Sequence, residues 1–427
     1  MNWRDRKKIF FLKLKEGNFR QLRFLILRRI KINLIMNPIG IPLAFILALV
    51  IYSLRPLIRI NLFSIPTGRL GHLILQPEYY LRKNNYNKIG FRILNIFFTS
   101  RAMEKNVIAN RQILKMLKRR MIIFDSYLFS WLYYSAEWTL KRTDIVSQLP
   151  HIETAEAESL YKEVDSSFKF TDQEIETGYS KLKLMGIDPV KDWYVVIFAR
   201  DSSYLKNTFP NHDWGYHDWR NADINSYKEA VKFIISKGGY VIRMGSEVNN
   251  DLDFSSSYYI DYSREFWDDF MDVFLVSKCK FLLGTNSGFS DLAVAFDKPR
   301  AIVNAIPLGH TPYGRNDIYI PKKFFDHQNA EFKTLRYVLL NNEDLIFDQE
   351  SFLENKYTCI DNSPKEILEL TKEMMSKLDN NFSMTINQEK LLDEYFSLFN
   401  DYNTGYGIRN PIGINFLEKN ESWIFDR

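Results

Sequence analysis

Two arginines and one run of small polar residues have the chemistry needed to bind a phosphate or diphosphate. Arginine makes bidentate, charge-assisted hydrogen bonds to phosphate oxygens. A run of small residues that opens a helix offers free backbone N–H groups, and glycine allows the backbone to approach an anion closely. The candidate donor-binding residues are Arg200, Arg243, Thr285, Asn286, Ser287, Gly288 and Asp291.

Each candidate also has a structural interpretation. Asn and Ser are common N-capping residues of helices, with or without a ligand nearby. Each arginine can equally be the partner of a carboxylate within the fold. Both interpretations stay open for each residue taken singly, and the agreement of three separate segments favours an anion site.

A polar loop supplies a second set of candidates. Metal ligation, substrate contact and an ordinary polar loop are three interpretations of its sequence, NHDWGYHDWRNADI (211–224). The spacing matches no structural zinc pattern, and these residue types are also typical of loops and helix caps. We predict a loop that contacts substrate, and no metal site. The substrate-loop candidates are His217, Asp218, Arg220, Asn221 and Asp223.

Alternating strands and helices in the C-terminal half place these residues at one edge of a sheet. The pattern predicts an α/β fold with a parallel sheet covered by helices on both faces. Ligands of such sheets bind at the carboxyl ends of the strands, where Arg200, Asp201, Arg243 and residues 285–288 fall. The predicted strands cover 193–200, 240–245, 279–284 and 300–304, and the predicted helices cover 226–239, 266–278 and 287–296.

Length and composition indicate an ordered chain of two or three domains. The chain has 427 residues, of which 46% are hydrophobic and 26% are charged, and these values exclude a disordered or collagen-like protein. Its two cysteines, Cys279 and Cys359, cannot build a disulfide scaffold or, by themselves, a four-ligand zinc site. This cysteine usage predicts a reducing compartment.

Positive charge is concentrated at the N-terminus. Residues 1–34 contain 11 Lys and Arg against Asp5 and Glu16, a local charge of +9, which leaves 46 basic and 50 acidic residues elsewhere. Large apolar residues alternate with these charges, as in KIFFLKLK (8–15). An arm that binds nucleic acid is poorer in such residues. The segment therefore predicts an anionic membrane surface as partner, and no nucleic acid.

An uncharged stretch from Ile35 to Leu54 follows and is long enough to cross a bilayer. It lacks the cleavage site and short basic region of a signal peptide. A spanning anchor, an interfacial or re-entrant segment and a buried core helix remain as interpretations. Pro38, Gly40 and Pro42 interrupt its first half, and basic residues flank both ends. These features favour a segment that enters and leaves the membrane on one face.

Several motifs together resemble a bacterial family of glycosyltransferases encoded in surface-polysaccharide gene clusters. The resemblance covers roughly residues 60–325. A first-domain signature of that family is similar to GRLGHLILQPEYYL (68–81). The other matching motifs are ARDSSYL (199–205), HDWRNADINSY (217–227), GGYVIRMGSE (238–247), FMDVFLVSKCKFLLGTNSGFSDLAVAFDKPRAIVN (270–304) and IPLGH (306–310).

Two wider likenesses agree with this family. GTNSGFSDLAVAFDKP (284–299) is similar to the donor-site loop and helix of heptosyltransferase-type enzymes, and FARDSSY (198–204) resembles an arginine motif of fucosyltransferases. The latter likeness implies that Arg200 contacts the donor β-phosphate. This sequence lacks their second adjacent arginine, because Ala199 precedes Arg200 and Asp201 follows it, so a fucosyl donor is not implied. The resemblance implies a GT-B architecture of two Rossmann-like domains, with the donor in the C-terminal one and no metal or cofactor required.

The sequence GRLGHL (68–73) resembles the glycine-rich first loop of GT-B acceptor domains. This likeness implies that Arg69, His72 and Glu78 face the cleft between the domains. A histidine or carboxylate can deprotonate an acceptor hydroxyl near neutral pH. We predict His72 as this general base, with Asp201 as second candidate, although a single histidine is more often structural.

The expected protein is thus a membrane-associated glycosyltransferase at the cytoplasmic face of the inner membrane. It would transfer a sugar from a nucleotide sugar to a surface glycan, lipid-linked in our expectation. A GT-B-folded nucleotide-sugar epimerase and a non-catalytic scaffold are the alternatives. The expected domains are a membrane segment (1–60), an acceptor domain (61–190), a donor domain (191–345) and a helical tail packing back on the acceptor domain (346–427).

Overall fold

The computed structural model confirms a mixed α/β protein with parallel sheets. It describes residues 38, 40–87, 92–150, 152, 155–201, 219–245, 250–266, 268–346 and 349–427. The chain divides into two compact units, each assembled from several segments, and we describe them separately. Unit 1 takes Met1–Gly68, Ile89–Ile108 and Arg120–Leu149, and unit 2 takes Arg69–Lys88, Ala109–Arg119 and Pro150–Arg427.

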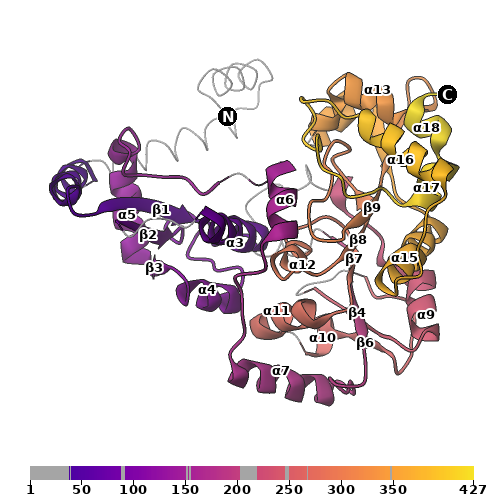
Figure 1. Cartoon of the computed structure of the whole chain (residues 1–427), viewed down its shortest axis with the longest axis horizontal. Coiled ribbons are helices and arrows are strands. Elements are labelled where there is room, and N and C mark those ends of the chain that lie inside the picture. The colour runs from indigo at the N-terminus through magenta and orange to yellow at the C-terminus, as the bar shows by residue number, and fades with distance from the viewer. Residues whose placement is uncertain are drawn as a thin grey trace. The chain divides into compact units, whose positions relative to one another are not determined.

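Unit 1 is built on a three-stranded parallel sheet in the order β1-β2-β3 (Figure 1). A helix over residues 40–54 and α5 pack together beside this sheet, and their apolar side chains share a core with Leu62 of β1. Tyr133 of α5 stacks on Phe98 of β2 with 4.9 Å between the ring centroids. The elements are β1 (Arg59–Ile65), β2 (Ile93–Thr99), β3 (Ile122–Phe124) and α5 (Tyr127–Leu140).

Residues 40–54 form a helix only partly buried in unit 1. Ala44 and Ile51 lie in the core, whereas Phe45 and Leu49 are exposed. Among the described residues, no helix has both the length and the apolar character needed to cross a bilayer. Most of the predicted membrane segment, residues 1–37, lies outside the described residues, and its membrane role stays a prediction.

Unit 2 contains a six-stranded, wholly parallel sheet in the order β6-β5-β4-β7-β8-β9. Its central strands are continuous apolar runs, and Val195, Val196 and Ile197 of β4 are fully buried. Such runs are typical of parallel strands covered on both faces. The strands are β4 (Tyr194–Phe198), β5 (Tyr240–Arg243), β6 (Tyr259–Asp261), β7 (Leu282–Gly284), β8 (Arg300–Ala305) and β9 (Ile318–Pro321).

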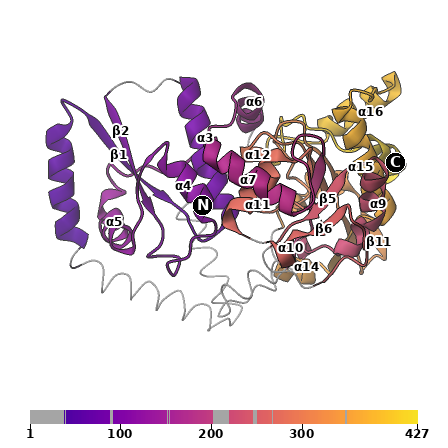
Figure 2. The same cartoon turned by 90° about the horizontal axis from the view of Figure 1, so that it is seen from below.

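Helices cover both faces of this sheet, as predicted. α9 and α15 lie on one face, and α11 and α12 lie on the other (Figures 1 and 2). α9 ends at Ser236, and Gly238, two residues later, has a φ of +82°, the left-handed conformation common after helix C-termini. The helices of unit 2 that precede β8 are α3 (Leu70–Asn87), α4 (Arg111–Lys118), α6 (Ala155–Glu163), α7 (Asp172–Leu184), α9 (Lys228–Ser236), α10 (Tyr262–Glu265), α11 (Asp269–Lys278) and α12 (Asp291–Ala295), with the short 3-10 helix η2 (Ile224–Tyr227).

The C-terminal tail packs mainly on the six-stranded sheet. Leu370 of α15 and Tyr395 of α16 belong to the same core as β4 and β8. The backbone N–H of Arg409 donates to Glu158 of α6, which lies in the range expected for the acceptor domain. The remaining elements are β10 (Lys323–Asp326), β11 (Glu331–Lys333), α13 (Leu335–Leu340), η3 (Glu343–Leu345), α14 (Gln349–Glu354), β12 (Tyr357–Ile360), α15 (Pro364–Leu378), α16 (Ile386–Ser397), α17 (Ile414–Lys419) and α18 (Glu421–Phe425).

Candidate functional site

The strand order of unit 2 reverses between β4 and β7, and two predicted donor-binding residues meet there. Arg200 follows β4, and its backbone N–H donates to the hydroxyl of Thr285 after β7 over 3.1 Å. Both residues are buried. A Cβ added to Gly284 would lie 2.4 Å from the carbonyl oxygen of Phe198, so the two strand ends approach too closely for any other residue. Open α/β sheets bind ligands at such reversal points.

The loop after β7 differs from its prediction. The helix expected over 287–296 is shorter, because α12 begins only at Asp291. Before it, the Ser287 N–H donates to the Ser290 hydroxyl over 3.0 Å. The side chain of Asn286 bonds to both backbone groups of Ile306, beyond β8. These side chains thus hold the loop in shape, while their proposed contact with a donor stays a prediction.

Arg220 is brought to this loop from the polar segment that precedes α9. Its Nη2 donates to the backbone carbonyl of Asn286 over 3.1 Å. Its Nε is buried and has no hydrogen-bond partner among the described residues. Burial lowers the pKa of Arg220, and Arg69 lowers it further, whereas Asp291 acts to raise it. Arg220, Arg69 and Asp291 therefore form one charged cluster beside the loop.

Asn221 connects that segment to Arg200. Its Oδ1 accepts a hydrogen bond from Arg200 Nη1, and the next N–H, of Ala222, donates to the Arg200 carbonyl over 3.0 Å. The substrate-loop candidates Arg220 and Asn221 therefore lie with the donor candidates Arg200 and Asn286.

Lys322, at the end of β9, is a site residue that sequence reasoning missed. The residue is 2% exposed, and its ammonium group donates to the carbonyls of Trp219 and Asn221 over 3.0 and 2.8 Å. It also pairs with Asp361 at 2.6 Å. The lysine positions the segment that carries Arg220. In the sequence it stands within PKKFF (321–325), where adjacent lysines suggest an exposed turn, so no signal marked it.

The first turn of α3 lies directly on the loop after β7. A Cβ on Gly288 would be 2.7 Å from the Gly71 nitrogen, and one on Gly71 would be 2.6 Å from Asp291 Oδ2. The two glycine-containing motifs thus contact each other within unit 2. His72 lies on this turn with an exposed side chain, and the preceding Arg69 is also exposed. The general-base role of His72 remains a prediction.

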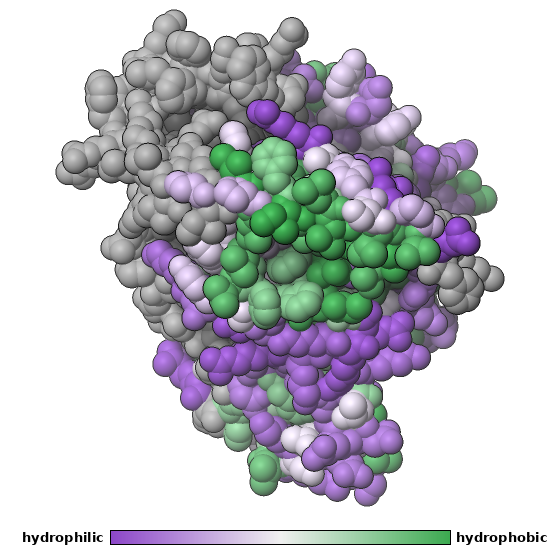
Figure 3. Space-filling model, turned by 90° about the vertical axis from the view of Figure 1, so that its left-hand side faces the viewer, coloured by the Kyte–Doolittle hydropathy of each residue, from purple (hydrophilic) through white to green (hydrophobic). Residues whose placement is uncertain are grey.

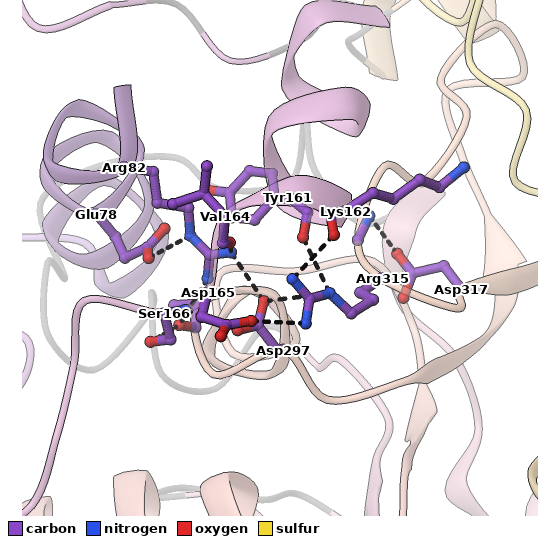
Figure 4. Close-up of polar contacts among 12 residues, drawn as sticks. Glu78, Arg82, Tyr161, Lys162, Val164, Asp165, Ser166, Asp297, Arg315 and Asp317 are labelled. Atoms are coloured by element: carbon purple, nitrogen blue, oxygen red, sulfur yellow. Dashed lines mark hydrogen bonds and ion pairs between the residues drawn. The ribbon is translucent and has the colours of Figure 1, made fainter. Parts of the chain in front are cut away.

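The expectation that Glu78 faces a cleft is wrong. Glu78 is completely buried and pairs with Arg82 one helical turn later at 2.5 Å. Arg82 also pairs with Asp297 at 2.8 Å, in the turn that follows α12 (Figure 4). Burial raises the pKa of Glu78 to about 7, although Arg82 acts against the shift. Glu78 therefore belongs to an ion-pair network that attaches α3 to the turn after α12.

A second ion-pair group extends this network (Figure 4). Arg315 pairs with Asp165 at 3.0 Å and donates to the carbonyl oxygens of Tyr161 and Lys162. The Asp297 carboxylate also accepts a hydrogen bond from the backbone of Ser166. The segment after α6 is therefore held to the same turn as α3, and together they surround the base of α12.

Arg243 has protein partners, as its structural interpretation predicts. It is 3% exposed and pairs with Asp261 of β6 at 3.1 Å, and its Nη2 donates to the carbonyl of Asn250. A guanidinium whose charge is balanced by a neighbouring carboxylate attracts an added anion less. Donor binding by Arg243 stays a prediction that these contacts do not favour.

The other candidates fall at different places. Asp201 is half-buried directly after Arg200. Asp223 caps η2, since its carboxylate accepts from the N–H of Asn225 over 3.0 Å. His217 and Asp218 lie outside the described residues. Within the described ranges, no group of three or more His, Cys, Asp and Glu side chains could hold a metal ion.

Glu104 of unit 1 is a second residue that the sequence did not indicate. Its Oε2 accepts hydrogen bonds from the backbone N–H groups of Thr67 and Gly68, both over 2.7 Å, and from the Ser100 hydroxyl. The carboxylate thus holds the loop that leaves β1 immediately before GRLGHL. No sequence pattern connects Glu104 with the motif, because the two are separated by more than thirty residues.

Comparisons with known proteins return only distant structural similarity. No family model matches the chain, and no curated protein matches its sequence. A family 9 glycosyl transferase from Veillonella parvula is similar at 8% identity and a TM-score of 0.43, covering 75% of this chain and 98% of that one. The ADP-heptose heptosyltransferase II of E. coli is similar at 12% identity and a TM-score of 0.36, covering 68% and 100%. Similarity at this level assigns neither a fold family nor an activity to this chain.

Proposed function

We propose that this protein is a glycosyltransferase of GT-B type that transfers a sugar from a nucleotide-sugar donor to a surface glycan. One observation carries the proposal. Arg200 and Arg220 meet the Thr285–Gly288 loop where the strand order of the parallel sheet reverses. The Nε of Arg220 is buried and has no hydrogen-bond partner within the part of the chain that the structure describes, so it offers a donor group to an anion. The negatively charged oxygen atoms of a diphosphate would accept hydrogen bonds from these donor groups.

The proposed chemistry follows from the charge of the leaving group. Transfer breaks the bond between the sugar's anomeric carbon and a donor phosphate oxygen, and that oxygen keeps the electron pair. Arginines and backbone N–H groups beside the diphosphate stabilise the charge that develops. Because these groups balance the charge, no metal ion or cofactor takes part in the proposed mechanism.

An acceptor hydroxyl forms the new bond to the anomeric carbon and loses its proton to a base. We propose His72 for this role because it is exposed on the first turn of α3, and that turn contacts the loop at Gly288. Asp201, adjacent to Arg200, is the second candidate. We further propose a lipid-linked acceptor and a site of action at the cytoplasmic face of the inner membrane, where nucleotide sugars are available.

A thermal-shift panel of UDP, GDP, CMP, ADP and dTDP sugars tests the donor site. The protein used keeps residues 40–54, because Ala44 and Ile51 belong to the core of unit 1. One nucleotide should raise the melting temperature, since a ligand at 100 times its Kd stabilises the folded state by about 2.7 kcal/mol. A folded protein that none of them stabilises would contradict the proposal.

Arg220→Ala tests whether the nucleotide sugar binds beside the Thr285–Gly288 loop. Losing a charged hydrogen bond of about 1.5–3 kcal/mol should weaken donor binding about 10- to 100-fold in calorimetry. Arg336→Ala serves as the matched control, because Arg336 is exposed on α13. Equal donor affinity in the two variants would remove Arg220 from the site.

A further inference from the structure

The helix over residues 40–54 is attached to unit 1 by one face. Its inward residues, among them Ala44 and Ile51, pack in one core with Tyr133 and Leu140 of α5. Gly40 comes so close to α5 that an added Cβ would lie 1.8 Å from the carbonyl oxygen of Ser135. The helix therefore lies along the surface of unit 1.

The opposite face of this helix is apolar and exposed. Its large residues recur at the i, i+4 and i+8 positions and at their neighbours, a spacing that places them on one stripe of a helix. No charged residue occurs between 40 and 54. The residues and exposed fractions are Ile41 (37%), Phe45 (62%), Ile46 (61%), Leu49 (68%) and Val50 (52%).

Further exposed apolar and aromatic residues of unit 1 occur at α5 and β3. The aromatic rings of Phe124 and Phe129 contact each other with centroids 4.9 Å apart. Figure 3 looks onto this side of unit 1 and shows a continuous apolar area bordered by hydrophilic residues. Large patches of this kind are rare on monomeric soluble proteins and mark interaction sites. The exposed residues from these elements are Ile122, Phe124, Tyr127, Leu128, Phe129 and Trp138.

The charges near this area are mostly basic. Arg55 and Arg59 follow the helix, and Lys141 and Arg142 follow α5, all with exposed side chains. Of these, Arg55 pairs with the carboxylate of Asp144. The Arg142 guanidinium lies 5.6 Å from the ring centroid of Trp138, which is exposed on α5. Residues 1–34, with their local charge of +9, precede the same helix in the sequence. An apolar stripe with basic flanks and boundary aromatics fits the interface of an anionic bilayer.

We propose that the outer face of helix 40–54, with the exposed aromatic residues of α5, inserts into the headgroup–acyl boundary of an anionic membrane. The inward face stays packed on α5, so the helix lies in the plane of the membrane surface. The basic residues that flank it contact lipid phosphates. This inference does not depend on glycosyl transfer, because it concerns unit 1 and its contacts alone.

Vesicle co-sedimentation with the full chain tests the proposal. The vesicles contain phosphatidylcholine alone or mixed with phosphatidylglycerol. The variant combines Phe45→Gln with Leu49→Gln, which removes apolar surface without adding negative charge. It should bind the mixed vesicles at least tenfold more weakly than the unchanged protein. The control combines Leu184→Gln with Val190→Gln, two exposed apolar residues of unit 2, and should bind as the unchanged protein does.

Binding that survives in the Phe45/Leu49 variant would overturn the proposal, because residues 1–34 alone would then account for it. Both substituted residues are exposed, so the melting temperature should stay within the range of the control. If this variant does not fold, Ile46→Gln with Val50→Gln tests the same stripe. A protein that ignores both vesicle types but forms a dimer in light scattering, lost in the variant, would make the face an interface between two copies and also overturn the proposal.

Discussion

The surroundings of three guanidinium groups distinguish Arg200, Arg220 and Arg243. Arg200 bonds to a neutral amide side chain, and Arg220 bonds to a backbone carbonyl while its Nε keeps no partner among the described residues. Arg243 instead pairs with the carboxylate of Asp261. The charge of Arg243 is thus largely compensated, and Arg220 lies near the carboxylate of Asp291. In the sequence, Arg200 and Arg243 look alike because each stands at the end of an apolar strand, whereas Arg220 stands in the polar loop 211–224.

Arg243→Ala should therefore destabilise the protein. The change leaves the Asp261 carboxylate and the Asn250 carbonyl without their partner, and breaking a buried pair from one side typically costs about 3–5 kcal/mol. Because Asp261 is partly exposed, we expect the lower end of that range in chemical denaturation. Wild-type stability combined with a strong loss of turnover would instead make Arg243 a ligand-binding residue.

Glu78 shows how burial changes the meaning of a carboxylate. Desolvation raises its pKa from 4.5 to about 7, so the folded state binds this proton more tightly than the unfolded state does. The contribution of this protonation to the free energy of unfolding is fully present below about pH 4.5 and is lost as the pH rises through about 7. Each pKa unit corresponds to about 1.4 kcal/mol.

Glu78→Gln should flatten this part of the pH dependence. The free energy of unfolding of the unchanged protein should fall between pH 5 and pH 8, by about 3 kcal/mol at most from this group. The glutamine variant should lose that slope and gain relative stability at pH 8. Glu163→Gln, on the exposed side of α6, is the control. Parallel pH profiles for Glu78→Gln and the unchanged protein would contradict the assignment.

At the scale of elements, the backbone of α3 contacts the backbone of the loop after β7 directly. Gly71 and Gly288 make the contact, and the Arg82–Asp297 pair fixes the other end of the same helix to the turn after α12. Two attachments along one helix restrict both its position and its rotation. The residues of the first turn, His72 included, are placed by these contacts.

Gly288→Ala should disturb that fit. The new Cβ would lie 2.7 Å from the Gly71 nitrogen, which is backbone and cannot rotate away. Steric overlap of this kind typically costs about 1–3 kcal/mol, so we expect a lower melting temperature, faster hydrogen exchange in the first turn of α3 and weaker donor binding. Ser180→Ala, on the exposed surface of α7, provides the comparison. Unchanged exchange in α3 would show that the contact has room for a methyl group.

At the scale of the whole molecule, charge is segregated along the chain. Residues 1–34 have a net charge of +9 against −4 for the rest. In the proposed membrane contact, electrostatic attraction is screened by salt, whereas apolar insertion is not. The two contributions can therefore be separated.

Raising the salt concentration should weaken binding to anionic vesicles without abolishing it. The residual binding at high salt should depend on Phe45 and Leu49 and be absent in their double glutamine variant. Flotation assays across a salt series measure both quantities. Complete release of the unchanged protein by salt would assign the interaction to charge alone and leave the apolar face without a membrane role.

Much of the α/β organisation could be predicted from the sequence, and much of the site could not. The continuous apolar run of β4 and the glycines after α9 mark a buried strand and a helix end locally. The helix after β7 was predicted too early, because Ser287 and Ser290 bond to each other instead of opening it. Lys322 was missed because the carbonyl groups that it bonds to, those of Trp219 and Asn221, are more than a hundred residues away in the sequence.

The sequence by itself determined that Arg200 and the Thr285–Gly288 loop share one edge of a parallel sheet, because strand direction and connection length impose that arrangement. Only the tertiary structure decided that Arg220 joins them while Glu78 and Arg243 pair inside the protein. Whether a charged side chain meets a ligand or a counter-charge depends on which distant segments pack beside it. Contacts such as Arg82 with Asp297 are set by the packing of whole helices, and no local pattern encodes them.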